Sequence, residues 1–157
     1  MAKVNAVPQG YHTVTASLIQ RDCARAIDFY KKALGAEERM RMPGPDGKIM
    51  HAEIQVGSSI VMMNDEMMGM QSAESLGASP VSFYLYVENA DQALQKAVAA
   101  GGKELMPATD MFWGDRMGQF ADPFGYRWTF ATHIKDMTPE EMKKGQQEWM
   151  KQMAGAH

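Results

Sequence analysis

The feature that most constrains this chain is an internal repeat with a spacing of 67 residues. Asp22 and Asn89 are each placed to cap a helix, and they lie 67 positions apart (89 − 22). Gly35 and Gly102, each placed to end a helix, keep the same spacing (102 − 35). Self-similarity at a fixed spacing indicates two copies of one structural unit. A chain of 157 residues has room for two such copies and little else.

Each copy is predicted to run strand, helix and then three strands. Apolar and polar residues alternate in the strands, apolar residues recur at helical spacing in the helices, and turn residues separate them. The first copy is expected to have a helix at 23–34 and strands at 12–19, 36–42, 48–56 and 58–64. The second is expected to have a helix between Asn89 and Gly101 and strands at 80–87, 103–109, 116–121 and 126–132. The sequence therefore predicts an α+β fold of two tandem βαβββ modules.

A further helix is predicted near the C-terminus, over residues 139–153. Thr138 and Glu141 have the spacing of a capping box, and Pro139 suits the first helical turn. A stripe at helical spacing follows, marked by Met142, Gln146, Trp149 and Met153, and it is apolar apart from Gln146. This stripe needs cover, either from a sheet of the same chain or from a partner subunit.

The expected division of the chain follows from these elements. It comprises an N-terminal extension at 1–10, a first module at 11–64, a linker at 65–79, a second module at 80–136 and a C-terminal helix and tail at 137–157. Sixteen methionines are present, several of them within residues 62–70. Methionine fills irregular gaps in cores and also forms adaptable binding surfaces, so this segment is either core filler or a flexible lid.

Charge and cysteine content narrow the classes of partner. The net charge is −3 and no basic block occurs, which argues against nucleic-acid binding. No apolar run approaches the ~18 residues that suggest a membrane span. Cys23 is the single cysteine, so a disulfide within the chain and a cysteine-based zinc cluster are excluded. We expect a cytoplasmic protein whose partners are small molecules or proteins.

Three segments resemble a known family. AIDFYKKALGAEE (26–38) resembles the first helix of the vicinal oxygen chelate superfamily, which includes glyoxalase, bleomycin-resistance and extradiol dioxygenase proteins. HAEIQVGSSIVMMND (51–65) and FWGDRMGQFADPFGYRW (112–128) resemble its PhnB-like branch. The resemblance implies paired modules whose curved sheets enclose a cup for a ligand and often for a divalent metal. It also implies a homodimer.

The resemblance also indicates where a metal would be held. The ligand positions of metal-dependent members fall here on Thr15, Val61, Ser82 and Thr129. None of these is an imidazole or a carboxylate, and such a set cannot offset the cost of dehydrating a divalent cation. We therefore expect no metal and no cofactor. Strand alternation places Thr15, Ser82 and Tyr84 on the polar face that lines the cup, so these residues and Thr129 are candidate ligand contacts.

The third strand carries a candidate catalytic pair. His51 and Glu53 lie two residues apart on one strand face, roughly 6–7 Å from each other, so a substrate or a water could bridge them. The alternative is a solvated or dimer-facing surface without a catalytic task.

The stretch from Phe112 to Arg116 is the second candidate. We expect a loop in which Trp113 stacks on a planar ligand group and Arg116 binds a carboxylate or phosphonate through its planar guanidinium. Asp115 and Arg116 are expected to form an ion pair. The alternative is a structural corner in which Asp115 and Arg116 cap backbone groups and the aromatic side chains plug the sheet. Asp122-Pro123-Phe124-Gly125, which follows, is expected to be a tight turn.

Three functions remain open at this point. The first is a PhnB-like protein that binds a small molecule in a polar and aromatic cup without metal. The second is a glyoxalase- or lyase-like enzyme in which His51 and Glu53 transfer a proton. The third is a structural or regulatory dimer without ligand chemistry. A fold of this type does not choose among them.

Overall fold

A computed structural model describes residues 4–156, so residues 1–3 of the expected N-terminal extension and His157 lie outside the described residues. The first module has one sheet and one long helix. It consists of β1 (Ala16–Gln20), α1 (Cys23–Leu34), β2 (Glu37–Pro43), β3 (Ile49–Val56) and β4 (Ser59–Asp65). Its strands lie in the order β1-β4-β3-β2, with β1 parallel to β4 and the other pairs antiparallel.

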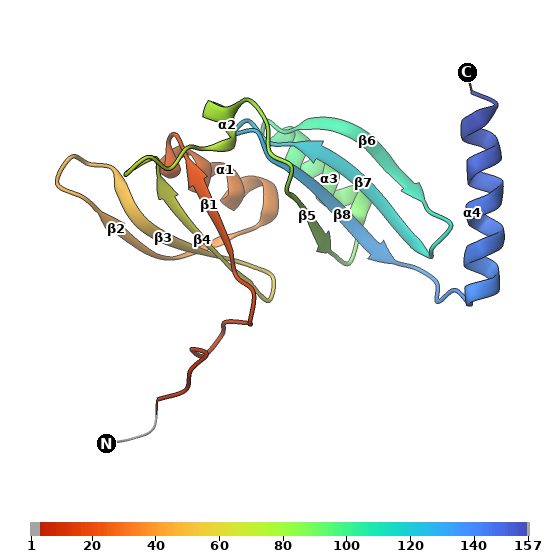
Figure 1. The fold of residues 1–157 in the computed structure, drawn as a ribbon, viewed down its shortest axis with the longest axis horizontal. Coiled ribbons are helices and arrows are strands. Elements are labelled where there is room, and N and C mark those ends of the chain that lie inside the picture. Colours follow the sequence, from red (N-terminus) through yellow and green to blue (C-terminus); the bar gives the residue numbers. More distant parts are fainter. Residues whose placement is uncertain (1–3, 157) are drawn as a thin grey trace.

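The second module repeats this arrangement. It consists of β5 (Ser82–Tyr86), α3 (Ala90–Ala99), β6 (Lys103–Asp110), β7 (Asp115–Ala121) and β8 (Arg127–His133). Its sheet order is β5-β8-β7-β6, again with the first strand parallel to the last. The α+β fold of two βαβββ modules is therefore confirmed. Figure 1 shows the two curved sheets side by side, with α1 and α3 packed against them.

The long helices begin as their capping residues predict. Asp22 accepts a hydrogen bond from the Arg25 amide, and Asn89 accepts one from the Gln92 amide. Gly35 ends α1 with a positive φ of 64°, a conformation that costs glycine little. Both helices bury one face, and α1 contacts α3.

One aromatic cluster joins the two modules. Tyr30 of α1 lies within 5.9 Å of Phe124 and 5.3 Å of Trp128, measured between ring centroids. At its centre, buried Asp122 accepts hydrogen bonds from the Tyr30 hydroxyl at 2.6 Å and from Trp128 Nε1 at 2.8 Å. It also accepts bonds from the amides of Phe124 and Tyr126, both at 2.9 Å. The expected turn at 122–125 is therefore also the point where the first module attaches to the second.

The first strand and the linker differ from expectation. Pairing between β1 and β4 starts at Ala16, so Thr15 precedes the strand and Val14 is 86% exposed. The linker contains a short helix that the sequence pattern did not indicate, α2 (Ala73–Leu76). Ser72 caps it, and the Glu66 carboxylate accepts hydrogen bonds from both the amide and the hydroxyl of Ser72. A local polar network, rather than an apolar period, therefore forms α2.

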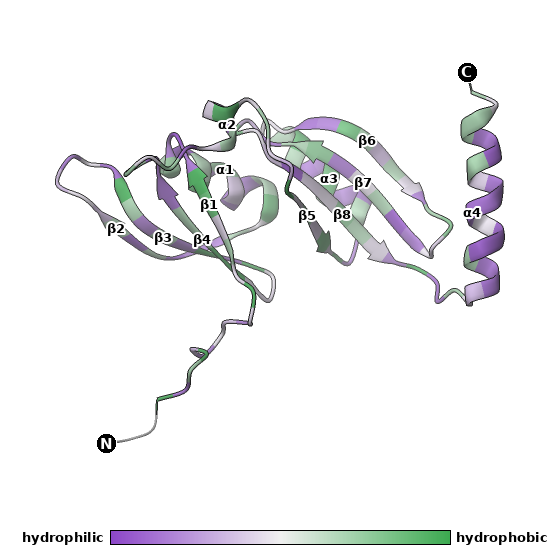
Figure 2. Cartoon of the chain, viewed as in Figure 1, coloured by the Kyte–Doolittle hydropathy of each residue, from purple (hydrophilic) through white to green (hydrophobic). Residues whose placement is uncertain are grey.

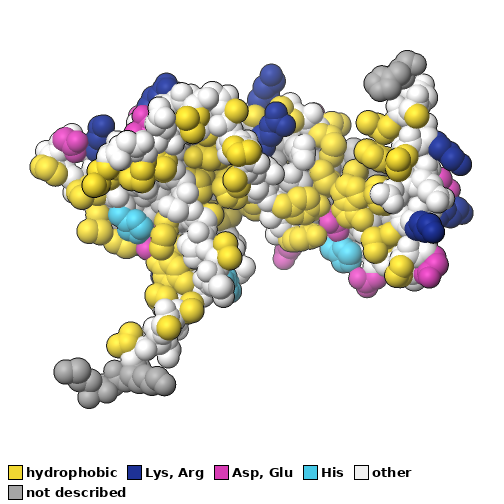
Figure 3. All heavy atoms as spheres, viewed as in Figure 1, with side chains coloured by type: hydrophobic (Ala, Val, Ile, Leu, Met, Phe, Trp, Pro, Cys, Tyr) yellow, Lys and Arg dark blue, Asp and Glu magenta, His cyan; other side chains and the backbone are white. Residues whose placement is uncertain are grey.

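The C-terminal helix α4 (Pro139–Ala154) begins with the predicted capping box of Thr138 and Glu141. It stands at one end of the molecule beside the second module, and Figure 2 shows hydrophobic and hydrophilic residues mixed along it. Gly145 packs closely on Phe112, but α4 has no buried residue. Hydrophobic side chains on α4 are therefore open to solvent in this chain (Figure 3). No helix within residues 4–156 is both long and apolar enough to cross a membrane.

Candidate functional site

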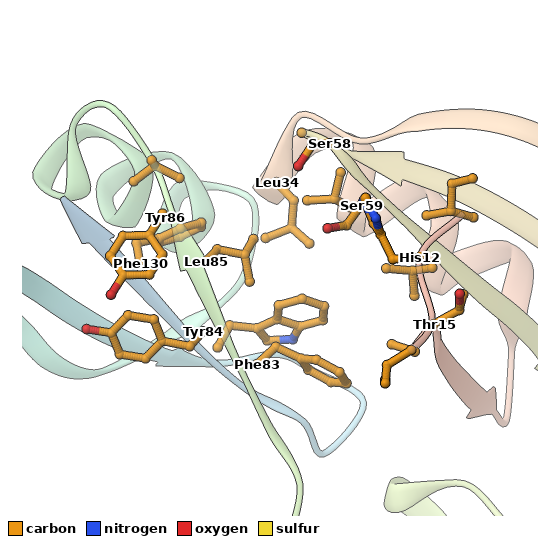
Figure 4. A pocket seen from close by; sticks show the side chains of 18 of the residues that line it. His12, Thr15, Leu34, Ser58, Ser59, Phe83, Tyr84, Leu85, Tyr86 and Phe130 are labelled. Carbon is orange, nitrogen blue, oxygen red and sulfur yellow. The ribbon is translucent and has the colours of Figure 1, made fainter. Parts of the chain in front are cut away.

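The alternation of β5 sends its side chains to two different surfaces. Phe83 and Leu85 point toward the first module, whereas the rings of Tyr84 and Tyr86 point to the other side of the strand (Figure 4). Tyr84 and Tyr86 are 45% and 67% exposed, and their ring centroids lie 5.4 Å apart. The edge strand of the second sheet therefore separates an apolar surface from an aromatic, hydroxyl-bearing one.

The apolar surface faces a cleft between the modules with a volume of about 770 Å³. One wall comes from β5 and β8, with Phe83, Leu85 and Trp128 in it, and the other from the segment around β1 and β4, with Thr15. Its lining is mostly apolar, with a few hydroxyl and imidazole groups. The volume lies within the roughly 300–1,000 Å³ typical of small-molecule sites.

On the open face of the second sheet, a buried carboxylate gathers hydrogen bonds from two strands. Asp115, only 3% exposed, accepts hydrogen bonds through Oδ2 from the hydroxyls of Tyr84 at 3.0 Å and Tyr86 at 3.1 Å. Its Oδ1 lies 2.8 Å from Nδ1 of His133, and Nε2 of the same imidazole lies 2.9 Å from Asp136. The contact between Asp115 and His133 follows from the register of β7 and β8, in which the two residues are directly opposite each other.

The charges of this cluster stabilise each other. Burial would raise the pKa of Asp115, but the hydrogen bonds from His133, Tyr84 and Tyr86 bring it below its usual value. Hydrogen bonds to Asp136 and Asp115 raise the pKa of His133. Burial, together with the hydrogen bond to Asp115, raises the pKa of Tyr84 to about 12, while a hydrogen bond from Trp113 opposes that rise. The cluster therefore favours an ionised carboxylate, an imidazolium and neutral phenols.

The loop before β7 positions Trp113 next to this cluster. Gly114 has a φ of 97°, and its carbonyl accepts hydrogen bonds from the amides of Ile134 and Lys135. Trp113 packs edge-on against Phe112, with 5.0 Å between ring centroids, and Phe112 in turn lies 6.2 Å from Trp149 of α4. Trp113 is half-buried, so part of its ring is accessible beside Tyr84.

The structure corrects the expected ion pair between Asp115 and Arg116. Arg116 lies in β7, within the strand predicted at 116–121, and strand alternation turns it to the opposite face from Asp115. There its Nε and Nη2 lie 2.6 and 2.8 Å from the Asp91 carboxylate, and its Nη1 lies 2.8 Å from Asp110. The guanidinium fork is occupied, which favours the structural alternative for Arg116.

The other predicted ligand contacts are only partly brought together. Thr129 lies opposite Tyr84 in the sheet, but it is buried and accepts a hydrogen bond from Gln119 at 3.2 Å. Ser82 lies on the same face, one alternation step before Tyr84. Thr15 lines the opposite wall of the cleft.

His51 and Glu53 lie in the other sheet and touch each other directly. Nε2 of His51 is 3.2 Å from Oε1 of Glu53, closer than the bridged arrangement expected from strand spacing. Tyr11, from the segment before β1, also donates its hydroxyl hydrogen bond to Glu53 Oε1. This bond and the contact with His51 lower the pKa of Glu53. The pair is thus formed, but its carboxylate already has two partners.

The positions that hold a metal in related proteins do not suit one here. Thr15, Val61, Ser82 and Thr129 together offer hydroxyl oxygens and one hydrocarbon side chain, with no imidazole or carboxylate. Within residues 4–156, no group of three His, Cys, Asp or Glu side chains is placed to hold a metal ion.

Sequence reasoning missed the two central members of the cluster on the second sheet. His133 is not among the candidate residues predicted from the sequence, and Asp115 is expected there only as a partner of Arg116 or as a cap of backbone groups. A usable signal existed, because His133 continues the alternation that places Arg127 and Thr129 on the polar face. The pairing of β7 with β8 was needed to bring Asp115 opposite it.

Comparisons with known proteins agree with this architecture. Residues 11–130 match the model of the Glyoxalase/Bleomycin resistance protein/Dioxygenase superfamily. An uncharacterised protein of Mycobacterium tuberculosis (strain H37Rv) is 39% identical over 131 residues, covering 80% of this chain and 77% of that protein.

Solved structures show the same fold. Protein PA1353 from Pseudomonas aeruginosa is 29% identical with a TM-score of 0.64, covering 79% of this chain and 99% of that one. A PhnB protein from Bacillus cereus is 17% identical with a TM-score of 0.59, covering 77% of this chain and 99% of that one, a likeness of fold alone. With the repeat, the sheet orders and the family match in agreement, the chain belongs to the glyoxalase/bleomycin resistance protein/dioxygenase superfamily.

Proposed function

We propose that this protein is a PhnB-like member of its superfamily that binds a small molecule with a planar, apolar part at the β5 edge of the second sheet. The observation that carries the proposal is the buried Asp115 carboxylate, which holds the hydroxyls of Tyr84 and Tyr86. Because both hydroxyls are fixed, the two exposed rings lose little further freedom when a ligand stacks on them. No step of the proposal uses a metal or a cofactor.

The surroundings of Tyr84 supply the remaining parts of a binding site. Trp113 offers a second aromatic surface, and the cleft between the modules, whose lining includes Tyr84 and Tyr86, offers apolar volume. His133, favoured as an imidazolium and half-exposed, offers a positive charge at the far end of the cluster. The matched family description includes bleomycin resistance proteins, which fits a binding role.

A second candidate function is proton transfer by His51 and Glu53. Their direct contact at 3.2 Å favours it. The lowered pKa of Glu53 makes its carboxylate a weak base, so binding at the second sheet remains the first proposal.

A screen of planar aromatic compounds by thermal shift is expected to yield a ligand that depends on Tyr84. A compound at 100 times its dissociation constant adds about 2.7 kcal/mol to the free energy of unfolding. Tyr84→Ala removes one stacking ring and is expected to weaken the affinity for that compound about three- to tenfold, measured by titration calorimetry.

Tyr11→Ala is the matched control, since it removes the same side chain from the segment before β1, where the Tyr11 hydroxyl donates to Glu53 of the first sheet. Unchanged affinity in this variant supports the second sheet as the site. If Tyr11→Ala and Glu53→Gln weaken binding while Tyr84→Ala does not, the ligand binds at the first sheet and the proposal is wrong. A broad panel without any shift would favour a dimer without ligand chemistry.

We also propose that the protein is a homodimer and that α4 takes part in the interface. Met142, Trp149 and Met153 remain exposed on α4 in the single chain. Truncation after Asp136 is expected to shift the protein from dimer to monomer in sedimentation velocity. A truncated chain that keeps the parent's oligomeric state would show that α4 is dispensable for assembly.

A cytoplasmic location is part of the same proposal. The single cysteine, Cys23, is fully buried, and burial raises the pKa of its thiol to about 12. Such a thiol is inert toward disulfide exchange, so the protein does not depend on an oxidising compartment.

A further inference from the structure

A second, smaller pocket opens where β5 and β8 begin. It has a volume of about 440 Å³ and lies between the end of the linker and the β7–β8 turn. Small and polar residues surround one arginine in it: Gly77, Ala78, Ser79, Pro80, Ser82, Gly125 and Arg127. Because none of these lining residues is acidic, the pocket presents positive charge.

Arg127 differs from Arg116 in having no partner among the described residues. Its side chain is exposed, and within residues 4–156 it makes no ion pair and no side-chain hydrogen bond. Arg116, by contrast, is occupied by Asp91 and Asp110. A planar guanidinium with unused N–H groups matches the geometry of carboxylate and phosphate oxygens.

A hydroxyl donor lies beside this guanidinium. Ser82 is directly opposite Arg127 in the sheet, on the same face, and its Oγ has no hydrogen-bond partner among the described residues. The Ser79 hydroxyl is already engaged with the backbone of Val81. Gly77, Ala78 and Gly125 contribute no side chain larger than a methyl group to the lining of the pocket.

We propose that this pocket binds the anionic group of a ligand, a carboxylate, phosphate or sulfate, through Arg127 and Ser82. This moves anion recognition from Arg116, where the sequence pattern placed it, to an arginine whose side-chain N–H groups have no partner within residues 4–156. The shared chemistry is a planar or tetrahedral oxyanion that accepts two parallel hydrogen bonds.

The position of the pocket also indicates which class of ligand would bind at Tyr84. This part of the inference rests on the proposed function. Ser82 and Tyr84 are two residues apart on one face of β5, which corresponds to about 6.6–6.8 Å along the strand. A ligand that places its anion on Arg127 can therefore reach the Tyr84 ring with its next few atoms. The class that fits is an aromatic acid with a short spacer, such as 3-phenylpropionate.

The anion site is tested first with inorganic phosphate and sulfate in a chloride background. Titration followed by NMR is expected to show saturable shifts at the Arg127 side-chain Nε–Hε and at the amides of residues 77–82. Arg127→Gln is expected to weaken this binding roughly tenfold or more, the effect of losing charge-assisted hydrogen bonds. Arg127→Lys keeps the positive charge but loses the planar guanidinium. Its affinity for these ions is expected to lie between those of the wild type and Arg127→Gln.

Lys144→Gln is the matched control, because it removes one positive charge from exposed α4 and leaves the pocket unchanged. Equal weakening in Lys144→Gln would mean that the ions respond to overall charge, and the inference fails. Absence of saturable shifts at Arg127 in the wild-type chain would overturn it as well.

Binding of 3-phenylpropionate, compared with the uncharged 3-phenylpropanol, separates the two proposals. If both hold, the acid binds about tenfold more tightly than the alcohol, and Tyr84→Ala and Arg127→Gln each weaken it. If phosphate shifts Arg127 but the acid is insensitive to Tyr84→Ala, the anion site stands and the aromatic site fails. If Tyr84→Ala weakens binding of the acid but Arg127→Gln does not, the aromatic site stands and the anion site fails.

Discussion

Asp122→Ala is expected to lower the free energy of unfolding by about 4 kcal/mol, one of the largest effects of a single substitution in this chain. Four donors converge on this buried carboxylate, from the Tyr30 hydroxyl, Trp128 Nε1 and the amides of Phe124 and Tyr126. Alanine leaves all four without a partner in a site closed to water. Urea unfolding monitored by circular dichroism measures the change.

Loss of the Asp122 carboxylate is expected to weaken the contact between the two modules as well as the turn at 122–125. Tyr30 comes from α1 of the first module, whereas the other three donors belong to the second. Asp28→Ala on the exposed side of α1 is the control and is expected to stay within about 0.5 kcal/mol of the parent. A loss below about 1 kcal/mol in Asp122→Ala would show that the network contributes little to stability.

Gly114→Ala is the second substitution with a large expected effect, a loss of about 3–5 kcal/mol. The φ of 97° at this position is strained for any residue with a Cβ, and an added Cβ would overlap the carbonyl oxygen of Lys135. The loop between β6 and β7 must then move away from the segment after β8. Because Trp113 and Asp115 flank this glycine, the movement also separates them from Tyr84 and His133.

Gly57→Ala measures the conformational part of this effect by itself, so the difference between the two variants gives the steric part. Gly57 also has a positive φ, 55°, but an added Cβ would meet no atom within 4 Å. Its cost is expected to be about 1–2 kcal/mol, the conformational term alone. Thermal unfolding and tryptophan fluorescence compare the two variants. Equal costs would mean that the loop relaxes freely around position 114 and does not hold Trp113 in place.

Much of the architecture could be predicted from the sequence because it depends on local patterns. The helix caps at Asp22 and Asn89 and the helix end at Gly35 depend on interactions within a few residues of the chain. The 67-residue spacing shows directly that the same unit occurs twice. The alternation at Ser82 and Tyr84 likewise identifies a polar face of the strand before any pairing is known. The short helix α2 escaped prediction because a hydrogen-bond network between Glu66 and Ser72 forms it, with no apolar period to detect.

The candidate site depended on contacts between residues distant in sequence. Sequence alone determined two βαβββ modules, a capped C-terminal helix and the presence of Asp115, Arg116 and His133. Only the tertiary structure decided their partners, because neighbours on a strand point to opposite faces and each then meets whatever the adjacent strand or helix presents. Arg116 thereby meets Asp91 of α3, whereas Asp115 meets His133 and the tyrosines of β5. Strand register, which no local pattern encodes, set the chemistry of this surface.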